Sequence, residues 1–464
     1  MNSVISSGSP QQRDSSVFSP AYAWYTLIIL TFINLINYLD RYVLASVGES
    51  VRATFQMGDK DLGTIQSAFF FVYMFASPFA GYLGDRVSRR ILIVAGIGTW
   101  SLATVATAFA DNYFHLWLAR ALTGIGEAGY GIVAPAILAD LFSKESRSRT
   151  LSVFYLALPV GTAAGYWFGP TVSQHFGHAP DAPHTSWMCN IGLHEGWRFA
   201  FLLGGLPGIL LAILAGFLRE PPRGGKDMID GHAALGEFKW SHVAGLLKTR
   251  SFIANVFATT AMTFAIGGLA TWAPAFVQRV HGYSEKEAGS LFGIIVAICG
   301  FLGTISGGFV ADFARRWTQA AHFVVPGITL SCSAISLMIA LLSSSRESFW
   351  GFGGVAVFLL FCNSGPLNAA ILNVSLPAVR ATAFALMIFT IHLLGDAFSP
   401  TLIGMISDHY EPDLGKAESL RRAFLIAPPI VFVGAIVLLI FARWLPRDMQ
   451  AIDAKIKEAS KEKK

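Results

Sequence analysis

The sequence GYLGDRVSRR, at positions 81–90, directly follows a long apolar run, and a related sequence, GGFVADFARR, follows another apolar run at positions 307–316. In each of them an acid, Asp85 or Asp312, precedes a cluster of basic residues, and the two acids are 227 positions apart. The two halves of the chain therefore repeat one pattern, which predicts a duplicated architecture.

The composition predicts an all-α polytopic membrane protein. Of the 464 residues, 53% are hydrophobic and 14% are charged, whereas soluble chains carry roughly 25% charged residues. The apolar runs are continuous and do not alternate with polar residues, which argues against a β-barrel. At about 20 residues for each membrane-spanning helix, the length allows roughly a dozen helices.

Twelve membrane-spanning helices account for the apolar runs. We expect them at 22–46, 63–84, 91–110, 114–142, 148–172, 197–218, 251–279, 286–311, 321–343, 350–374, 381–408 and 423–444. With the N-terminus inside, 23 of the 34 Lys and Arg residues fall on inner segments or the adjoining ends of spans, and 8 on outer segments or the ends next to them. This excess predicts that both termini face the cytoplasm.

The twelve spans divide into two bundles of six helices, joined by a long polar linker. We expect a cytoplasmic tail over 1–21, an N-terminal bundle over 22–218, a cytoplasmic linker over 219–250, a C-terminal bundle over 251–444 and a charged cytoplasmic tail over 445–464. In the linker, Leu235, Phe238, His242 and Leu246 recur at helical spacing. This spacing predicts a short helix on the inner membrane surface.

The two repeated loops resemble the signature loop of the major facilitator superfamily, whose members are secondary transporters built from two six-helix bundles. Gly81, Asp85 and the arginines that follow match that loop at the expected place after the second span, although Ser88 stands where the family usually has glycine. The sequence ARALTGIGEAGY at 119–130 resembles the family's pattern in the fourth span, an arginine followed by closely spaced glycines.

Three further segments resemble the Spinster group of lysolipid and sphingolipid transporters. They are NYLDRYVLA at 37–45, RALTGIGEAGYGIVAPAILADLF at 120–142 and HLLGDAFSP at 392–400. The resemblance runs along the whole membrane portion of the chain and implies transport of an amphipathic lipid. Because no outer loop carries a glycosylation sequon, we expect a bacterial inner-membrane protein.

Asp40 and Arg41 place two charges inside the first span. A charge in hydrocarbon is costly, so it is usually paired, enclosed in a water-filled cavity or functional. Neighbouring helical residues point in different directions, so we expect each charge to find its partner on another helix. Asn34, Tyr38 and Arg41 recur at helical spacing and predict a polar stripe. The alternative is a wet outer helix end, with both charges at headgroup level.

Arg120 and Glu127 lie two turns apart on one face of the fourth span. Desolvation favours the neutral form of an enclosed carboxyl group, and a nearby arginine favours its charged form. Such an acid can therefore take up and release a proton as its surroundings change. We hypothesise that Asp40 and Glu127 handle protons and exchange Arg41 and Arg120 as partners. A permanent ion pair between the first and fourth spans is the alternative.

Polar residues of the second half are candidates for substrate binding. His392 and Asp396 are four positions apart on the eleventh span, where they can touch. They form either a second titrating or headgroup-binding site or a local pair that steadies a bend before Pro400. Asn363 in the tenth span and Trp272 in the seventh suit an amphipathic ligand.

The two repeated loops are also candidates for a cytoplasmic gate. We expect Asp85 to accept hydrogen bonds from a helix N-terminus and the loop arginines to pair with acids of the other half. These contacts would close the inner side in the outward-facing state. The residues concerned are Asp85, Arg86, Arg89, Arg90, Asp312, Arg315 and Arg316. The alternative is that these arginines only fix the topology.

The sequence as a whole predicts a proton-coupled secondary active transporter that moves an amphipathic lipid, of lysophospholipid or sphingoid type, by alternating access. A proton-coupled symporter of small organic anions is one alternative. A receptor or channel that does not alternate is another, but a channel would need a continuous ring of equivalent polar residues, and the two halves place their charges unequally.

The expected partners of the chain are its substrate, protons and membrane lipids. It carries no phosphate-binding loop motif and no compact metal-binding pattern, so we expect no enzyme activity, no cofactor and no metal. Its basic residues follow the membrane topology, so we expect no nucleic acid partner, and we expect a monomer.

Overall fold

The computed structural model describes residues 19–84, 86–142, 150–151, 153–177, 193–221, 240–376 and 379–461. Within these ranges the chain forms helices and no strand. Ten helical segments of the described chain are long and apolar enough to cross a membrane, and one of these segments, Thr382–Phe441, covers both the eleventh and the twelfth predicted spans. The predicted all-α polytopic class is confirmed.

Short polar residues cap the starts of two helices, α1 (Pro20–Ser46) and α5 (Tyr113–Leu141), in the first half of the described chain. The other described helices of this half are α2 (Gly48–Phe55), α3 (Asp59–Gly84), α4 (Arg89–Ala108), α7 (Ala157–Phe176) and α9 (Gly196–Ala215). The Ser19 hydroxyl accepts from the Tyr22 backbone N–H at 3.3 Å, and Asn112 caps α5 in the same way. Such caps satisfy N–H groups that a helix start leaves free. The sequence predicts no helix at the position of α2, which lies between the first two expected spans.

The second half contains two interruptions inside predicted spans. Its helices are α10 (Trp240–Leu246), α11 (Arg250–His281), α12 (Glu285–Ala314), α13 (Ala321–Leu342), α14 (Arg346–Phe361), α15 (Ser364–Asn373), α16 (Arg380–Ile391), the π-helical turn η3 (His392–Asp396), α17 (Ser399–Phe424), α18 (Ala427–Phe441) and α19 (Leu445–Lys461). The tenth predicted span is divided between α14 and α15, and the eleventh contains η3. Gly415, with a φ of 72°, bends α17 between the eleventh and twelfth predicted spans, a conformation that glycine adopts without strain.

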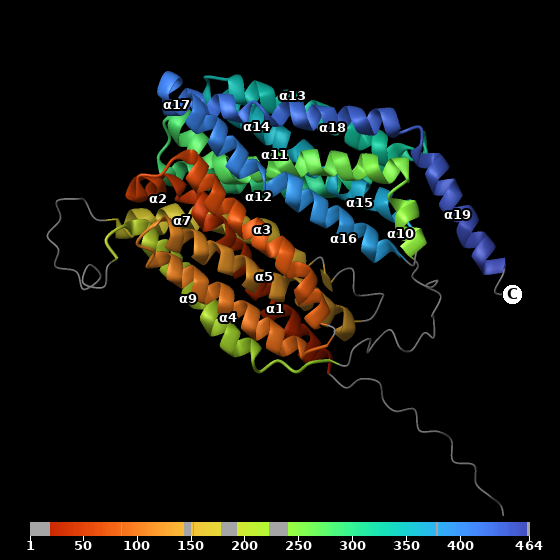
Figure 1. The fold of residues 1–464 in the computed structure, drawn as a ribbon, viewed down its shortest axis with the longest axis horizontal. Helices are drawn as coiled ribbons and strands as arrows, with labels where there is room; N and C mark the ends of the chain where they lie inside the picture. The colour runs from red at the N-terminus through yellow and green to blue at the C-terminus, as the bar shows by residue number, and fades with distance from the viewer. Residues whose placement is uncertain are drawn as a thin grey trace, which may run out of the picture.

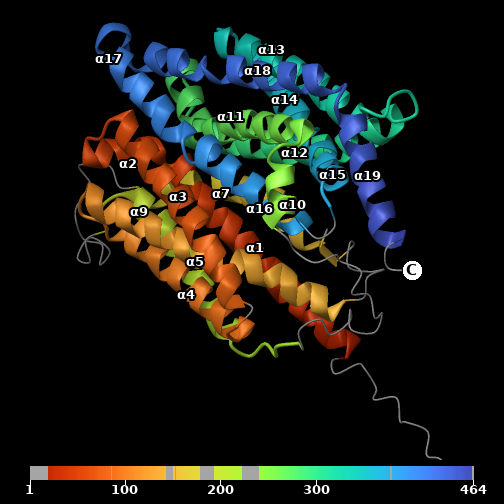
Figure 2. The same cartoon turned by 45° about the vertical axis from the view of Figure 1, so that its right-hand side comes forward.

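The helices form two groups that lie side by side (Figure 1). In the first group α4 packs against α5 and α9, α3 against α5, and α1 against α7. In the second group α13 packs against α14 and α18, and α11 against α17 and α18. The groups meet along α3 with α17 and along α7 with α12, and Figure 2 shows α17 beside α3.

The two groups approach each other closely where α1 ends and α3 begins. We call this the outer end, because the sequence predicts that it faces away from the cytoplasm. A Cβ on Gly63 of α3 would lie 2.3 Å from the carbonyl oxygen of Pro400 in α17, and a Cβ on Gly404 would lie 2.4 Å from the carbonyl oxygen of Asp59. Only glycine permits such an approach of two backbones.

The outside of both groups is strongly apolar. Phe79, Phe217 and Phe309 are among many large apolar side chains that the described helices expose. Long helices with surfaces of this kind are stable in lipid. The chain is therefore an integral, multi-pass membrane protein.

Candidate functional site

A cluster of four charged residues, which we call the inner cluster, lies within the first group of helices. It consists of Asp40 and Arg41 from α1 and Arg120 and Glu127 from α5. Asp40, Arg120 and Glu127 are buried, with exposed fractions of 1%, 0% and 1%. Charges at such positions are expensive unless they are paired or functional, so the partners of each one matter.

Arg41 and Glu127 form an ion pair between α1 and α5. The Arg41 Nε donates to Glu127 Oε2 at 3.1 Å, and the Arg41 Nη2 contacts the same oxygen. The guanidinium carbon lies 5.0 Å from the Tyr38 ring centre, 4.9 Å from that of Phe69 and 5.6 Å from that of Tyr73. Arg41 is therefore held between a carboxylate and three aromatic rings, and 15% of its side chain is exposed.

Asp40 points away from this ion pair, towards α4. The Thr104 hydroxyl donates to Asp40 Oδ2, whereas Oδ1 is buried with no hydrogen-bond partner among the described residues. Asp40 and Arg41, although adjacent in sequence, thus contact different helices.

Arg120 is buried with none of its hydrogen-bonding capacity used. Its Nε, Nη1 and Nη2 have no hydrogen-bond partner in the described structure, and its guanidinium carbon lies 5.6 Å from the Phe69 ring centre. Arg120 therefore donates no hydrogen bond to Asp40 or Glu127, and Glu127 Oε1 also lacks a partner among the described residues. The inner cluster therefore contains unused donors and acceptors on neighbouring groups.

The His392–Asp396 pair of the second half lies against the aromatic residues around Arg41. The His392 Nδ1 is 2.9 and 3.0 Å from the two carboxylate oxygens of Asp396. The Tyr73 ring meets the His392 ring edge to face, with centroids 6.0 Å apart. Tyr73 therefore lies between Arg41 in one half and His392 in the other, and it joins the two predicted polar sites.

Three other predicted binding residues form hydrogen bonds with backbone carbonyls and do not join the inner cluster. Asn34 donates to the Phe154 carbonyl at 3.2 Å, and Trp272 Nε1 donates to the Pro400 carbonyl at 3.0 Å. Asn363 donates to the carbonyls of the preceding turn and accepts from a threonine hydroxyl. Of the predicted stripe on α1, Tyr38 and Arg41 lie together, whereas Asn34 contacts the segment before α7.

The predicted cytoplasmic gate residues that the structure describes contact their own halves. Arg86 stacks on Tyr82, and Arg89 pairs with Asp140. The exposed Asp312 lies 4.0 Å from His322 Nε2. Arg316 stacks on Phe313, and no contact across the halves is found for the described residues Arg90 and Arg315. Asp85 lies outside the described residues.

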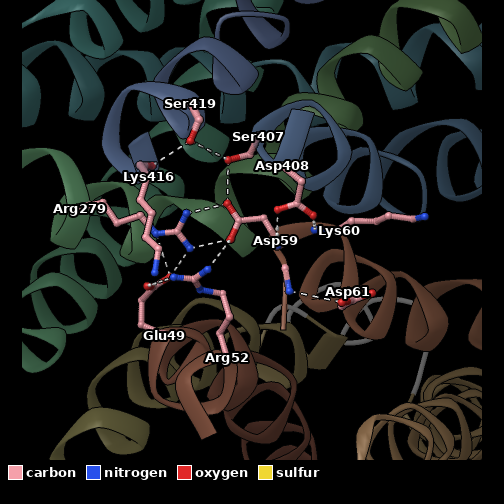
Figure 3. Close-up of polar contacts among 11 residues, drawn as sticks. Glu49, Arg52, Asp59, Lys60, Asp61, Arg279, Ser407, Asp408, Lys416 and Ser419 are labelled. Carbon is pink, nitrogen blue, oxygen red and sulfur yellow. Dashed lines mark hydrogen bonds and ion pairs between the residues drawn. The ribbon is translucent and has the colours of Figure 1, made fainter. Parts of the chain in front are cut away.

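A second charged cluster, which we call the outer cluster, joins the two halves at the outer end (Figure 3). Arg279 of α11 donates to the two carboxylate oxygens of Asp59 at 2.6 and 2.7 Å. It also donates to Glu49 Oε1, from Nε at 3.0 Å and from Nη2 at 2.5 Å. Glu49 belongs to α2 and Asp59 begins α3, so one arginine of the second half binds two acids of the first.

Further contacts fix Asp59 and the start of α3. The Ser407 hydroxyl of α17 donates to Asp59 Oδ2 at 2.7 Å, and Arg52 Nη1 lies 3.8 Å from Asp59 Oδ1. Asp408 accepts from the backbone N–H groups of Asp59 and Lys60 at 2.7 and 2.8 Å. An acid from the second half therefore caps a helix of the first half, where the helix dipole favours negative charge.

The outer cluster is organised as an ion-pair network. Carboxylate oxygens of Asp59, Asp408 and Glu411 lie within 4.8 Å of one another, a spacing that could hold a metal ion. However, Arg279 already binds both oxygens of Asp59, and backbone N–H groups bind both oxygens of Asp408. Hydrogen bonding thus uses the oxygens that a metal would need.

Sequence reasoning did not select the outer cluster. Glu49, Arg52 and Asp59 fall in the connection 47–62, which the predicted topology places outside, and Arg279 follows Asp59 by 220 positions. One signal was available, because a basic residue at the outer end of a span runs against the tendency of basic residues to lie inside. Such an exception suggests an acidic partner nearby.

Comparison with known proteins gives one family match and several relatives. The Major Facilitator Superfamily model matches residues 30–400. The chain is 34% identical to the sphingosine-1-phosphate transporter SPNS2 of Xenopus tropicalis, over 95% of this chain and 86% of that protein. It is 36% identical to protein spinster homolog 1 of Mus musculus, over 90% of this chain and 80% of that protein.

Two solved structures superpose on most of the chain. A bacterial homolog of the human lysosomal transporter Spinster, in an inward-facing and unoccupied conformation, gives a TM-score of 0.84 at 23% identity and covers 93% of this chain and 99% of that one. A D-xylose-proton symporter gives a TM-score of 0.69 at 16% identity, over 90% of this chain and 97% of that one. At such low identities the superpositions describe the fold alone.

Proposed function

Because the chain belongs to the major facilitator superfamily and to its Spinster-like members, and is therefore a membrane transporter and not an enzyme, we propose that it moves an amphipathic lipid by proton-coupled alternating access. The predicted major facilitator fold is confirmed by the family match and by the superpositions. The substrate class, the proton coupling and the roles of individual residues belong to the proposal.

The proposed substrate is a lysophospholipid or a sphingoid derivative. The SPNS2 relative is a sphingosine-1-phosphate transporter, and its similarity extends over most of both chains. Arg41 and Arg120 carry guanidinium groups, which suit phosphate and carboxylate oxygens. The rings of Tyr38, Phe69 and Tyr73 beside Arg41 offer apolar surface to the part of the lipid next to its headgroup.

Asp40 and Glu127 are the proposed proton-handling acids. The observation that carries this proposal is the set of unused polar atoms in the inner cluster: the three nitrogens of Arg120, Asp40 Oδ1 and Glu127 Oε1. A buried polar group without a partner costs about 1–3 kcal/mol, so a permanent structural network accounts poorly for this arrangement. Exchange of partners, uptake of a proton or arrival of a headgroup satisfies these atoms in another state.

In the proposed cycle the two arginines exchange partners. A proton on Glu127, or an anionic headgroup on Arg41, releases the Arg41–Glu127 pair, and Arg120 then binds an acid or the headgroup. The His392–Asp396 pair provides the second half's contact to the headgroup or a second titrating site, because Tyr73 brings it next to Arg41.

The outer cluster keeps the outer end closed in the proposed inward-facing state, and its ion pairs separate in the outward-facing state. The inner side then closes through the two repeated loops. The residues proposed to pair there across the halves are Asp85, Arg86, Arg89, Arg90, Asp312, Arg315 and Arg316. In the present state the described members of this set contact their own halves.

The remaining expectations complete the proposal. We propose that the moving bodies are the bundles 22–218 and 251–444, with the linker 219–250 and both termini in the cytoplasm. We also propose that the protein works as a monomer in a bacterial inner membrane.

The test is substrate-dependent proton movement in proteoliposomes that enclose a pH-sensitive dye. We expect a lysophospholipid or a sphingoid phosphate to produce proton flux, and small carboxylic acids to produce none. Protein-free liposomes and the Asp40→Asn, Glu127→Gln double variant control for leakage caused by the lipid. Flux with small acids alone would instead support the organic-anion symporter, and lipid transport without proton flux would refute the coupling.

A further inference from the structure

An apolar groove of about 570 Å³ lies on the outside of the second half. It is bounded by α11 on one side, by α16, η3 and α17 on the other, and by α18. Its lining is apolar except for Thr260 and Thr390, and each of these hydroxyls already donates to a carbonyl of its own helix at 2.8 Å. The groove therefore suits a hydrocarbon chain and offers no free polar group to a ligand.

The length and position of the groove match one leaflet of a membrane. On α11 its lining runs from Phe252 to Phe264, which corresponds to about 18 Å at 1.5 Å per residue. Half of the hydrocarbon core is about 15 Å thick. Because α11 begins at the end that we expect to face the cytoplasm, the groove runs from the inner membrane surface to the bilayer centre.

Two basic side chains lie at the inner end of the groove. Arg250 precedes the groove-lining Ile253 and Phe257 by three and seven positions, so the three lie on one face of α11. Lys248 follows Leu247, which also lines the groove. Both basic residues are exposed, so they can reach an anionic headgroup whose chain lies in the groove.

The surroundings of Arg250 fit the headgroup level of a membrane. Its guanidinium carbon lies 5.3 Å from the Trp444 ring centre, and tryptophan is enriched at membrane–water interfaces. Asp448 already caps the start of α11 by accepting from the Ser251 backbone N–H at 3.1 Å. A phosphate would therefore be held by the side chains of Arg250 and Lys248 and not by the helix N-terminus.

The groove also reaches the back of the π-helical turn. Leu394 of η3 lines the groove, while His392 of the same turn contacts Tyr73 of the first half. Single π-helical turns inside α-helices frequently occur at functional sites. A chain in the groove would pack directly against the element that carries His392 and Asp396.

We propose that this groove binds one acyl chain of an anionic phospholipid from the inner leaflet, with the phospholipid headgroup on Arg250 and Lys248. This lipid is a resident ligand, separate from the transported substrate. The inference uses the proposed orientation of the chain, and it does not depend on proton coupling or on the identity of the substrate.

The test is native mass spectrometry of the full-length protein, equilibrated with equal amounts of phosphatidylglycerol and phosphatidylcholine that carry the same chains. We expect one phosphatidylglycerol to be retained in preference to phosphatidylcholine. Val256→Trp fills the groove from α11 and should abolish retention of both lipids, and Thr260→Trp does the same one turn further along. Ile298→Trp, on the exposed face of α12 outside the groove, should retain the lipid like the wild type.

The headgroup contact is tested separately. Each of Arg250→Gln and Lys248→Gln should lower the preference for phosphatidylglycerol about fivefold, the effect expected for one basic residue at an anionic membrane surface. Lys286→Gln, at the outer end, is the matched control and should leave the preference unchanged. Equal retention by the wild type and by both groove-filling variants would overturn the proposed site, and an unchanged preference in the two charge variants would overturn the anionic headgroup.

Discussion

Replacing Arg279 with glutamine is predicted to release the outer end of the molecule. Arg279 is the residue of the second half that binds both Asp59 and Glu49 of the first. Its removal leaves the fully buried Asp59 without its main partner in the state where the outer end is closed. In the proposed outward-facing state these groups are already apart, so the substitution costs little there.

The magnitude follows from the burial of the two partners. The Asp59 side chain is 0% exposed and the Arg279 side chain 6%, and removing one partner of a buried pair costs about 3–5 kcal/mol. The Glu49 side chain is 21% exposed and can recover water, so we take the lower end, about 3 kcal/mol. Because about 1.4 kcal/mol corresponds to a factor of ten, the equilibrium should move about a hundredfold towards the outward-facing state.

Distance measurements between spin labels can detect this change. Labels at the exposed residues Ala53 in α2 and Lys286 in α12 report the separation of the halves at the outer end, in a background without the four native cysteines. We expect Arg279→Gln to add a longer distance to the distribution.

Arg198 provides the matched control, because this buried arginine at the same end donates to the Ala108 and Ala110 carbonyls, both in its own half. Arg198→Gln should lower stability and keep the wild-type distances. If Arg279→Gln also keeps them, the outer cluster does not hold the halves together and our reasoning about it is wrong.

Three further substitutions have distinct expected outcomes. Gly63→Ala should slow the initial rate of lipid uptake, because the added Cβ would lie 2.3 Å from the Pro400 carbonyl oxygen. Gly98→Ala, whose Cβ would meet no atom within 4 Å, should leave the rate unchanged. Equal uptake rates in the two variants would contradict the close approach of α3 and α17. Arg120→Met should abolish proton-coupled uptake without lowering the thermal unfolding midpoint, since no described hydrogen bond is lost; a large loss of stability would indicate a structural role. Trp272→Phe should lower the free energy of unfolding by about 1 kcal/mol and leave substrate affinity unchanged, and a marked loss of affinity would place Trp272 in the binding site.

The residues of the inner cluster could be predicted because a charge inside an apolar run is a local signal. Pairing between the first and fourth spans was expected, but the sequence could not show which arginine binds which acid, because Arg41 and Glu127 are 86 positions apart. Asp40 needs hydrogen-bond donors and Arg41 needs acceptors, and the sequence does not say which neighbouring helix supplies them. Side-chain direction and helix packing decide that Asp40 contacts Thr104 while Arg41 contacts Glu127.

The roles of uncharged polar residues in apolar runs were harder to predict than those of charged residues. Asn34, Asn363 and Trp272 carry the same groups that would bind a ligand, yet in the structure they donate to backbone carbonyls. Such side chain–backbone bonds are common within helices and between them, and a sequence does not distinguish them from ligand contacts. The outer cluster was difficult to predict for the opposite reason. Charged residues in a connection between two spans resemble ordinary solvent-exposed residues.

A structure of the outward-facing state, obtained by cryo-electron microscopy of the Arg279→Gln variant, tests the central claim most directly. We predict that Glu127 has left Arg41 and that the guanidinium of Arg120 now donates to Asp40 or Glu127. If Arg41 still binds Glu127 and Arg120 still lacks a partner when the molecule opens outwards, the two arginines do not exchange acids and the proposed mechanism of coupling is wrong.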